Sequence, residues 1–527
     1  MMKTVFVKRL ISAAAITATS ILATSAFAGD VLLSASDGSI SVSGELLSFE
    51  GGNYTIRTTL GEMVLSSDTV SCAGDSCPSL IIEPEKVAGV KISGSDTIGT
   101  GLMPLLMTGY ASSLGGEIES VLTSNGELIW EVISDGGFGD SIGSFSVDSS
   151  ATGAAFDDLL TGDSVIGMAS RRIVRAEARA LSQDGAGSMV AIEQEHIIAV
   201  DSLLTIVNPN NSIDTLSIRD IGRIYRGEVT NWSQLGGPDL RIVVYSRTES
   251  AGARNVFETR IFGEPLTNGV ARIVDTNAAM ASRILANEGA IGFVGFAFLN
   301  GAKALNIVSE CGITSLPDAF AAKTEEYPLQ SRLYLYSRID TISDEARAFL
   351  NFAISSSADG VVSKAGYISL GVERIEQINA QNRMRQMINS TSDAFELSVM
   401  RELQVELLQW DRLSTTFRFS AGSDDLERKS MLDMIRLVEY LATLPAGADI
   451  ALVGFTDSDG AFNANRNLSL NRAQVAQTAL IDFAEGQTDH INFVNFGFGE
   501  LAPAACNDSN SNKRINRRVE VWVRTLN

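Results

Sequence analysis

The sequence predicts a multidomain protein that combines α/β and α+β folding units, and three observations carry this prediction. The chain has 527 residues, enough for three or four ordinary domains, and 45% hydrophobic and 20% charged residues are typical of globular proteins. Short apolar segments alternate with helical patterns through the middle and the C-terminal part of the chain. A stretch with only strand-like alternation comes before them and predicts a small β-module.

The first 28 residues have the features of an export signal. Basic residues precede an apolar or small stretch at 10–22, and Ala26-Phe27-Ala28 fits the small-x-small rule for cleavage. We therefore expect a signal peptide at residues 1–28, removed on export. A transmembrane anchor is the alternative, but the apolar run is short for a span and no stop-transfer charges follow it.

Four further segments follow the signal. Their predicted bounds are 29–85 for the small β-module, 86–375 for an α/β domain, 376–414 for a helical linker and 415–527 for a C-terminal α+β domain. The linker is rich in Gln, Glu, Arg, Met and Leu and contains neither Pro nor Gly. The C-terminal domain is predicted to contain strand 416–420, helix 425–444, strand 450–455, helix 468–484 and strands 490–497 and 519–523.

The four cysteines fit an oxidising compartment. Cys72 and Cys77 flank Gly74 at a spacing that favours a local disulfide. A metal site there would need further soft ligands, and none lie nearby. Cys311 and Cys506 are far apart in sequence, so a bond across domains and two free thiols both stay open.

Composition and motifs exclude several function classes. Lys plus Arg number 41 against 63 Asp plus Glu, and a net charge of −22 without a basic cluster disfavours nucleic acid as a partner. No zinc-type spacing, P-loop or dinucleotide fingerprint occurs, so we expect no metal and no cofactor. Ser141 lies in a Gly-x-Ser-x-Gly match, but the chain has only His196 and His490, in different domains. A wall hydrolase is therefore only a minor alternative.

The most specific motifs lie near the C-terminus. Gly454-Phe-Thr-Asp-Ser-Asp-Gly460 is followed by Gly497-Phe-Gly-Glu500 and Asn516-Arg-Arg-Val-Glu520. With these motifs, residues 417–524 resemble the OmpA C-terminal domain, the peptidoglycan-binding module shared with Pal and MotB. The resemblance implies a βαβαββ fold. Phe455 stands where that family often has His.

An acid and a base in these motifs suit a zwitterion. Asp457 follows a predicted strand and Arg472 lies one turn into the next predicted helix, so a carboxylate could receive an ammonium while a guanidinium grips a carboxylate. The resemblance implies that the ligand is the free end of diaminopimelate in peptidoglycan. It also implies that Asp457 and Arg472 are the anchors, that Thr456, Asn465 and Leu468 shape the pocket, and that Arg517 lies beside it. An ordinary salt bridge between Asp457 and Arg472 is the alternative.

A second resemblance covers residues 88–370. The segments 91–99 and 159–171, and above all Ile224-Tyr-Arg-Gly-Glu-Val-Thr-Asn-Trp-Ser-Gln-Leu-Gly-Gly-Pro238, resemble a periplasmic phosphate-binding protein of the PstS type. The resemblance implies a two-lobed periplasmic-binding-protein fold whose lobes close on an anion.

Local chemistry also favours an anion site. Ser93-Gly-Ser-Asp-Thr97 lies between a strand and a helix, where hydroxyls and the free N–H groups of a helix N-terminus can donate to an anion. Arg247 precedes another loop-to-helix turn and could balance the charge. The candidate residues are Ser95, Thr97, Ser150, Thr152, Ser170, Arg171, Arg247 and Gly252. Ser95 and Thr97 could equally be simple helix N-caps.

Two departures from the phosphate-binding pattern leave the ligand open. Ala251-Gly252-Ala253 replaces the usual Ser-Gly-Thr, and Ser170-Arg171 stands where phosphate binders place an Asp. An extra Arg favours a fully ionised or carboxylate-bearing ligand. Phosphate, another small anion and no small ligand all remain.

We therefore expect a periplasmic, peptidoglycan-associated protein of a Gram-negative envelope that binds a small anion such as phosphate. The alternative is a structural envelope scaffold whose middle domain binds an envelope protein instead of a solute.

Overall fold

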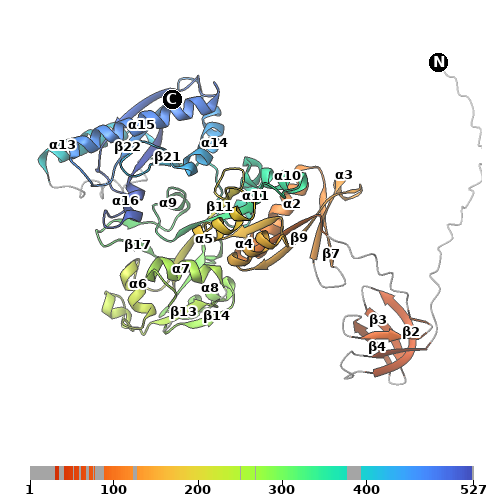
Figure 1. Cartoon of the computed structure of the whole chain (residues 1–527). Coiled ribbons are helices and arrows are strands. Elements are labelled where there is room, and N and C mark those ends of the chain that lie inside the picture. Colours follow the sequence, from red (N-terminus) through yellow and green to blue (C-terminus); the bar gives the residue numbers. More distant parts are fainter. Residues whose placement is uncertain are drawn as a thin grey trace, which may run out of the picture. The chain divides into compact units, whose positions relative to one another are not determined.

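The computed structural model divides the chain into two compact units, Met1–Lys86 and Val87–Asn527 (Figure 1). It describes residues 30–34, 41–50, 53–58, 61–66, 70–74, 76–77, 88–122, 128–249, 251–266, 269–376 and 393–524. The expected signal peptide lies outside these residues. Within the described ranges, no helix combines the length and apolarity needed to cross a membrane.

The first unit is a five-stranded antiparallel sheet in the order β4-β3-β2-β1-β5. Its strands are β1 (Asp30–Ser34), β2 (Ser41–Glu50), β3 (Asn53–Thr58), β4 (Gly61–Ser66) and β5 (Ser71–Ala73). Alternate side chains such as Val31 and Leu33 point to one face and form a small core. The strand-like alternation of this segment thus corresponds to a sheet, and the expected Cys72–Cys77 disulfide is present.

An α/β domain with two lobes opens the second unit. Its main sheet has the order β14-β13-β15-β11-β19-β10-β6-β9-β8-β7, and β16 pairs with β11. The strands are β6 (Val90–Ser95), β7 (Glu117–Leu122), β8 (Leu128–Ile133), β9 (Ser141–Ser150), β10 (Ile166–Ala169), β11 (Glu195–Val207), β13 (Val243–Arg247), β14 (Arg272–Val274), β15 (Ala290–Gly295), β16 (Lys303–Ala304) and β19 (Gln330–Ser337). A smaller sheet holds β12 (Thr215–Ser217), β17 (Asn306–Val308) and β18 (Thr314–Ser315).

β11 is the strand that joins the two lobes. Its residues 195–202 pair with β19, and residues 203–207 pair with β15. Each lobe has its own apolar core, around Leu106 and Phe349 in the first lobe and around Phe257 and Phe293 in the second. Two cores that share one long strand give the two-lobed arrangement.

Most helices of both lobes follow a strand in the chain. They are α1 (Asp96–Gly101), α2 (Met103–Ser113), α3 (Ser134–Gly137), α4 (Thr152–Thr161), α5 (Arg175–Gln183), α6 (Ile218–Tyr225), α7 (Gly252–Phe262), α8 (Asn277–Leu285), α9 (Ala319–Lys323), α10 (Asp344–Ile354) and α11 (Asp359–Lys364). Because β10, β6 and β9 are parallel, their carboxyl ends share one edge, where α/β sheets commonly bind ligands.

The C-terminal domain has a mixed sheet in the order β20-β21-β24-β22-β23. Its elements are β20 (Arg374–Ile375), α13 (Ala394–Leu407), β21 (Asp411–Arg418), α14 (Arg428–Ala442), β22 (Asp449–Phe455), α15 (Phe462–Ala484), β23 (Asn492–Gly497), α16 (Asn510–Asn516) and β24 (Arg518–Arg524). The predicted strand and helix order is confirmed, with a short α16 added between the last two strands. The bounds differ in that β21 begins at Asp411 and α15 begins at Phe462.

Part of the expected linker lies against this sheet. Residues 394–407 form α13, whose buried Val399, Leu403 and Leu407 recur at helical spacing and pack with Trp410 and Trp522. The expected boundary at 414/415 falls inside β21. Residues 377–392 of the expected linker lie outside the described residues.

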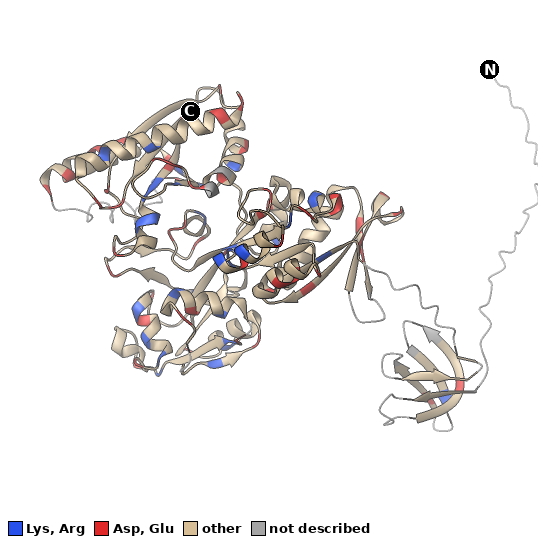
Figure 2. Cartoon of the chain, in the orientation of Figure 1, with Lys and Arg blue, Asp and Glu red and all other residues tan. Residues whose placement is uncertain are grey.

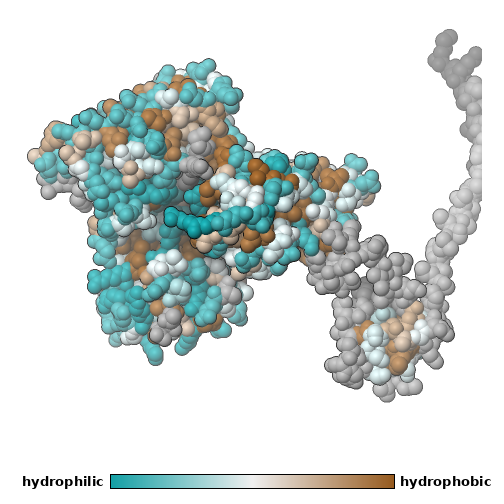
Figure 3. Space-filling view, viewed as in Figure 1, coloured by the Kyte–Doolittle hydropathy of each residue, from teal (hydrophilic) through white to brown (hydrophobic). Residues whose placement is uncertain are grey.

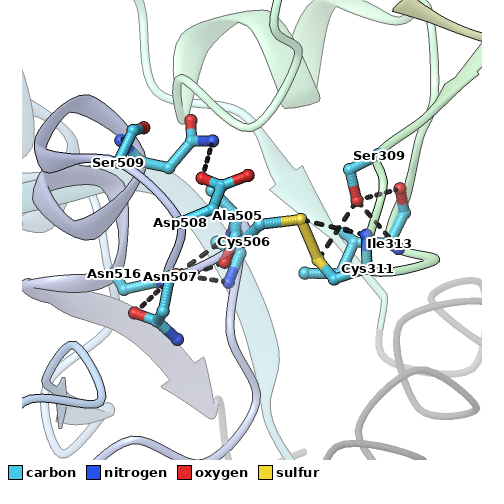
Figure 4. Close-up of a disulfide and its surroundings, with 11 residues drawn as sticks. Ser309, Cys311, Ile313, Ala505, Cys506, Asn507, Asp508, Ser509 and Asn516 are labelled. Atoms are coloured by element: carbon cyan, nitrogen blue, oxygen red, sulfur yellow. Dashed lines mark hydrogen bonds between the residues drawn. A yellow bond between two sulfur atoms is a disulfide. The ribbon is translucent and has the colours of Figure 1, made fainter. Parts of the chain in front are cut away.

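Covalent and ionic contacts join the C-terminal domain to the α/β domain within the second unit. Cys311 and Cys506 form a disulfide, which resolves the alternative that their sequence positions left open (Figure 4). Arg412 of β21 donates to Glu326 at 2.6 Å. Hydrophilic residues cover most of the face of this unit that Figure 3 presents.

Candidate functional site

The loop between β6 and α1 forms one wall of the candidate anion site. Gly94 has φ +122°, and a Cβ there would lie 2.3 Å from the carbonyl oxygen of Met168, so glycine is required. Ser95 occupies the N-cap position of α1 but makes no side-chain cap bond. Its Oγ is buried and without a partner among the described residues, so the simple capping role is not realised. Such a hydroxyl is available to a ligand.

The N-terminus of α7, from the second lobe, faces this loop. A Cβ on Gly252 would lie 3.1 Å from Ser170 Oγ, 3.7 Å from Asp96 Oδ1 and 3.8 Å from Thr97 Oγ1. Glycine therefore leaves a small space between the lobes, lined by two hydroxyls, one carboxylate and the first turn of a helix. The free N–H groups of that turn favour an anion.

A hydrogen bond between Thr152 and Ser170 connects the start of α4 to the end of β10. Thr152 Oγ1 accepts from the Ser170 backbone N–H at 3.1 Å and lies 2.9 Å from Ser170 Oγ. Ser150 is exposed at the end of β9, opposite Ser95 in the parallel ladder. These predicted hydroxyl residues thus lie at the same sheet edge, at the carboxyl ends of β9, β6 and β10.

Arg247 lies at the end of β13 with its side chain largely buried. Its guanidinium donates to Asn277 Oδ1 at 2.7 Å and to the Asp275 carbonyl at 3.0 Å, which fixes its direction. Its Nε is buried and has no partner within the described part of the chain. Burial lowers the pKa of Arg247, and the nearby Asp96 and Asp275 oppose that shift. A buried cation with an unused donor suits an anion ligand.

Arg171 differs from its expected role. It binds Glu177 in a bidentate ion pair at 2.7 and 3.0 Å and lies over the ring of Phe156. Its charge is therefore already matched. The inference that an extra arginine selects a fully ionised ligand loses its basis, because this charge is not surplus.

The second candidate site surrounds Asp457, just after β22. Arg517 Nη1 donates to Asp457 Oδ2 at 2.9 Å, and Arg517 Nε donates to the Phe419 carbonyl. Among the described residues Asp457 and Arg472 form no ion pair, so the alternative of a salt bridge between these two is wrong. The structure thus places Arg517 beside Asp457.

Arg472 lies on α15, held by the loop that follows β21. Its Nε and Nη2 donate to the Ser423 carbonyl at 3.0 and 2.8 Å, while its buried Nη1 has no partner in the described ranges. Burial lowers its pKa to about 10, with Asp457 acting in the opposite direction. The expectation that Arg472 lies one turn into its helix is wrong, because α15 already begins at Phe462.

The remaining predicted pocket residues lie around this pair. Thr456 Oγ1 is buried without a partner among the described residues. Asn465 Nδ2 donates to Glu500 Oε2 at 2.7 Å and approaches the Asp457 carbonyl at 3.4 Å. Leu468, half-buried, is one turn before Arg472 on α15.

Family models match both domains. Residues 120–357 match the PBP superfamily domain, and residues 418–517 match the OmpA family. The chain joins a PBP superfamily domain to an OmpA family domain. We call the whole α/β domain that contains the first match the PBP domain, and the C-terminal domain that contains the second match the OmpA domain.

Relatives divide between the two domains. The phosphate-binding protein PstS of Bacillus subtilis is 26% identical over 210 residues, which cover 40% of this chain and 67% of that protein. Motility protein B of Helicobacter pylori is 30% identical over 110 residues, or 20% of this chain and 42% of that protein. An ABC-type phosphate transport receptor from Vibrio cholerae aligns over 53% of this chain and 99% of that chain, at 23% identity and a TM-score of 0.40.

Sequence reasoning missed Asp96 of the PBP domain. This residue was seen only as part of the loop motif, yet its carboxylate lies beside the space at Gly252 and acts on Arg247. The only sequence signal was its position between two hydroxyl residues at the start of a helix. Asp96 adds an acceptor to a site otherwise made of donors.

Among the described residues, Ser141 forms no hydrogen bond with His196 or His490. Ser141 is exposed at the start of β9. His196 is buried, and burial lowers its pKa to about 4. No cluster of three metal-ligating side chains occurs within the described part of the chain.

Proposed function

We propose that the protein is exported to the cell envelope, where the OmpA domain binds peptidoglycan and the PBP domain captures a small anion. Phosphate is the first candidate for that anion. The convergence of Thr97, Ser170 and the first turn of α7 around Gly252 is the observation that carries the proposal. The relative of the PBP domain from Bacillus subtilis is named a phosphate-binding protein, which supports phosphate as that candidate.

Hydrogen phosphate fits the polar groups at this site. Its oxygens would accept from Ser95, Thr97, Ser170 and Arg247 and from the N–H groups of α7. Its proton would be donated to Asp96, which supplies the acceptor that the Ser170-Arg171 segment lacks. Sulfate carries no such proton at neutral pH, so its oxygens would meet the Asp96 carboxylate unfavourably. Asp96 thus gives the site a physical basis for choosing phosphate.

The OmpA domain offers a complementary pair of charges to a zwitterion. The ammonium of diaminopimelate would bind Asp457, and its carboxylate would bind the free Nη1 of Arg472. Thr456, Asn465 and Leu468 would line the pocket. Arg517 would hold the Asp457 carboxylate in place through the bond that it already makes. The wall-bound protein would then reside in a Gram-negative periplasm.

A scaffold that binds an envelope protein is the second candidate function. The observation that favours it is the pair Ala251 and Ala253, which flank Gly252 and bring no hydroxyls to the α7 turn. Neither function requires catalysis, and we propose that the protein is not an enzyme.

Calorimetry on the mature full-length chain tests the anion proposal. Phosphate, sulfate and small carboxylates are titrated into the protein and into Arg247→Ala, with the exposed Arg283→Ala as the matched control. Phosphate binding that Arg247→Ala abolishes and Arg283→Ala leaves intact supports an anion receptor. Absence of heat with every anion contradicts it and favours the scaffold.

A further inference from the structure

A cavity of about 380 Å³ lies between the two lobes and reaches the OmpA domain. Ser170, of the candidate anion site, lies at its wall, together with one face of α7 and the start of β19. Arg514 of α16 lines the same cavity, so the OmpA domain contributes to it directly. Its volume lies in the range of sites for small organic molecules. That is far more than a single tetrahedral oxyanion fills.

The cavity is strongly basic. Five of its lining residues are arginines, and Glu325 is the one acid among them. Lys and Arg colour α5, α7 and α16 around this region in Figure 2. Electrostatic repulsion between the arginines would destabilise such a cavity unless acids or a bound anion balance them.

Two of the five arginines are neutralised from outside the cavity. Arg171 pairs with Glu177 and Arg172 pairs with Glu195, each at 2.7 Å. The charges of Arg171 and Arg172 are therefore matched, and these two residues do not need a bound anion to balance them.

The other three arginines share Glu325, the acid that lines the cavity. Arg260 forms no ion pair among the described residues and donates only to the Gln330 carbonyl at 3.3 Å. Arg514 pairs with Glu427, an acid outside the cavity, at 2.8 Å and with Glu325 at 3.2 Å, so Arg260 is the one of the three that forms no ion pair among the described residues. Arg332 has Glu325 at 3.4 Å, and its buried Nε makes no hydrogen bond within the described ranges.

Glu325 cannot neutralise this group alone, since Arg418 also lies 3.5 Å from it. Asp433 lies near Arg332 and Arg418 and supplies some further negative charge. Burial lowers the pKa of Arg260, and Glu325 opposes that shift while Arg514 adds to it. Arg260 and Arg514, from different domains, therefore face one cavity as like charges, and the one acid that lines the cavity, Glu325, acts on both of them and on Arg332.

We propose that Arg260, Arg332 and Arg514 form a second anion subsite, so that the cleft takes an oligophosphate chain. One terminal phosphate group would bind at Gly252, and a later group would bind between Arg260 of the PBP domain and Arg514 of the OmpA domain. This inference rests on the proposed anion binding and extends it to a ligand class.

The geometry of α7 sets the length of this ligand. Gly252 and Arg260 lie on the same helix, and eight residues span about 12 Å along a helix axis. A long arginine side chain can cover part of that distance, so the ligand must bridge the remainder. A single phosphate group is too short to contact both ends, whereas three linked phosphate groups can reach toward both.

Titration of the mature full-length chain with orthophosphate and tripolyphosphate tests the inference. We expect tripolyphosphate to bind at least about tenfold more tightly, because each added charge-assisted contact contributes that much or more. ATP carries three linked phosphate groups on a nucleoside. Comparison of its affinity with that of tripolyphosphate therefore tells whether the cleft accepts a free or a nucleoside-bound oligophosphate. Either one binding more tightly than orthophosphate supports the subsite.

Variants locate the effect. Arg260→Gln should remove about tenfold or more of the affinity for tripolyphosphate and change that for orthophosphate little. Arg514→Gln should act in the same direction, and Arg283→Gln, an exposed arginine on α8, should change neither. Arg260→Gln breaks no ion pair of the described chain, so it remains informative if Arg514→Gln weakens the domain contact.

The outcomes separate this inference from the proposed function. Equal affinity for the two anions, or a preference for tripolyphosphate that survives both Arg260→Gln and Arg514→Gln, would overturn the subsite while anion binding stands. Failure of every anion to bind overturns the proposed function and the subsite together.

Discussion

Arg517 donates a hydrogen bond to Asp457 at 2.9 Å, in the pocket of the OmpA domain. Three residues earlier in the chain, Arg514 donates to Glu325 of the PBP domain at 3.2 Å. One short segment, α16 and the residue after it, thus contacts both candidate sites. The disulfide between Cys311 and Cys506 lies close before this segment in the sequence and fixes the same loop to the PBP domain (Figure 4).

Removal of either charge from the Asp457 pocket should abolish attachment to the cell wall. Asp457→Ala leaves no acceptor for an ammonium, and Arg472→Ala leaves no donor for a carboxylate. Loss of one partner of a desolvated charged contact costs on the order of 2–5 kcal/mol. Cosedimentation with purified peptidoglycan measures the effect.

The matched control for this prediction is Arg466→Ala. Arg466 is also on α15, but its partner is Glu402 of α13 and the pair is partly exposed. We expect this variant to sediment with peptidoglycan like the unchanged protein. If Asp457→Ala and Arg472→Ala sediment with peptidoglycan as well as the unchanged protein does, the pocket assignment is wrong.

Asp96→Asn should change the anion preference of the PBP domain. With the carboxylate replaced by an amide, hydrogen phosphate keeps only a neutral acceptor for its proton, and sulfate no longer meets a negative charge and can accept from the amide N–H. We expect the ratio of phosphate to sulfate affinity to fall by about tenfold or more, since hydrogen bonds to charged groups contribute about 1.5–3 kcal/mol. Calorimetry with both anions measures the ratio. Asp148→Asn, an exposed acid on β9, is the control, and an unchanged ratio in Asp96→Asn would remove Asp96 from the site.

The sequence was informative where signals are local. A strand, a turn and a helical pattern in adjacent residues predicted a loop-to-helix turn after Arg247. The structure agrees, since α7 begins there at Gly252. The start of α15 was predicted six residues late, because Asn463, Asn465 and Asn467 are poor helix formers. Tertiary contacts override this preference, since Asn465 is held by Glu500.

Contacts between domains could not be predicted in the same way. Arg514 and Glu325 are 189 residues apart, and no periodicity or motif relates two residues at that separation. The pairing of Cys311 with Cys506 was left open for the same reason. The basic cavity combines residues from four distant segments, so it becomes visible only once the fold is known.

Loss of the interdomain disulfide should destabilise the second unit. The bond closes a loop with a sequence separation of 195, and the chain-entropy model gives an upper value of about 5 kcal/mol for a loop of that length. Cys311→Ser together with Cys506→Ser should lower the main thermal transition and separate it into two. Scanning calorimetry of the full chain measures this. The control is the double variant Cys72→Ser and Cys77→Ser, which removes the disulfide of the first unit. If the main transition is unchanged in the Cys311→Ser and Cys506→Ser variant, noncovalent contacts alone hold the two domains together.

Asp201 should make the stability of the PBP domain depend on pH. It lies on β11, where the strand passes between the lobes, and is only 6% exposed. Burial raises its pKa to about 6, although the Ser202 N–H donates to its carboxylate.

The direction of the effect follows from the raised pKa. Between about pH 4 and 6 the folded chain keeps a proton that the unfolded chain releases, so this group's contribution is full below pH 4 and is lost as the pH rises through 6. The loss is at most about 3 kcal/mol, from a shift of about two pH units. Asp201→Asn keeps an acceptor oxygen and cannot ionise. We therefore expect its melting temperature, relative to the unchanged protein, to be higher at pH 7.5 than at pH 4.5. Asp148→Asn should show no such change, and a constant difference for Asp201→Asn would mean that Asp201 ionises normally in the fold.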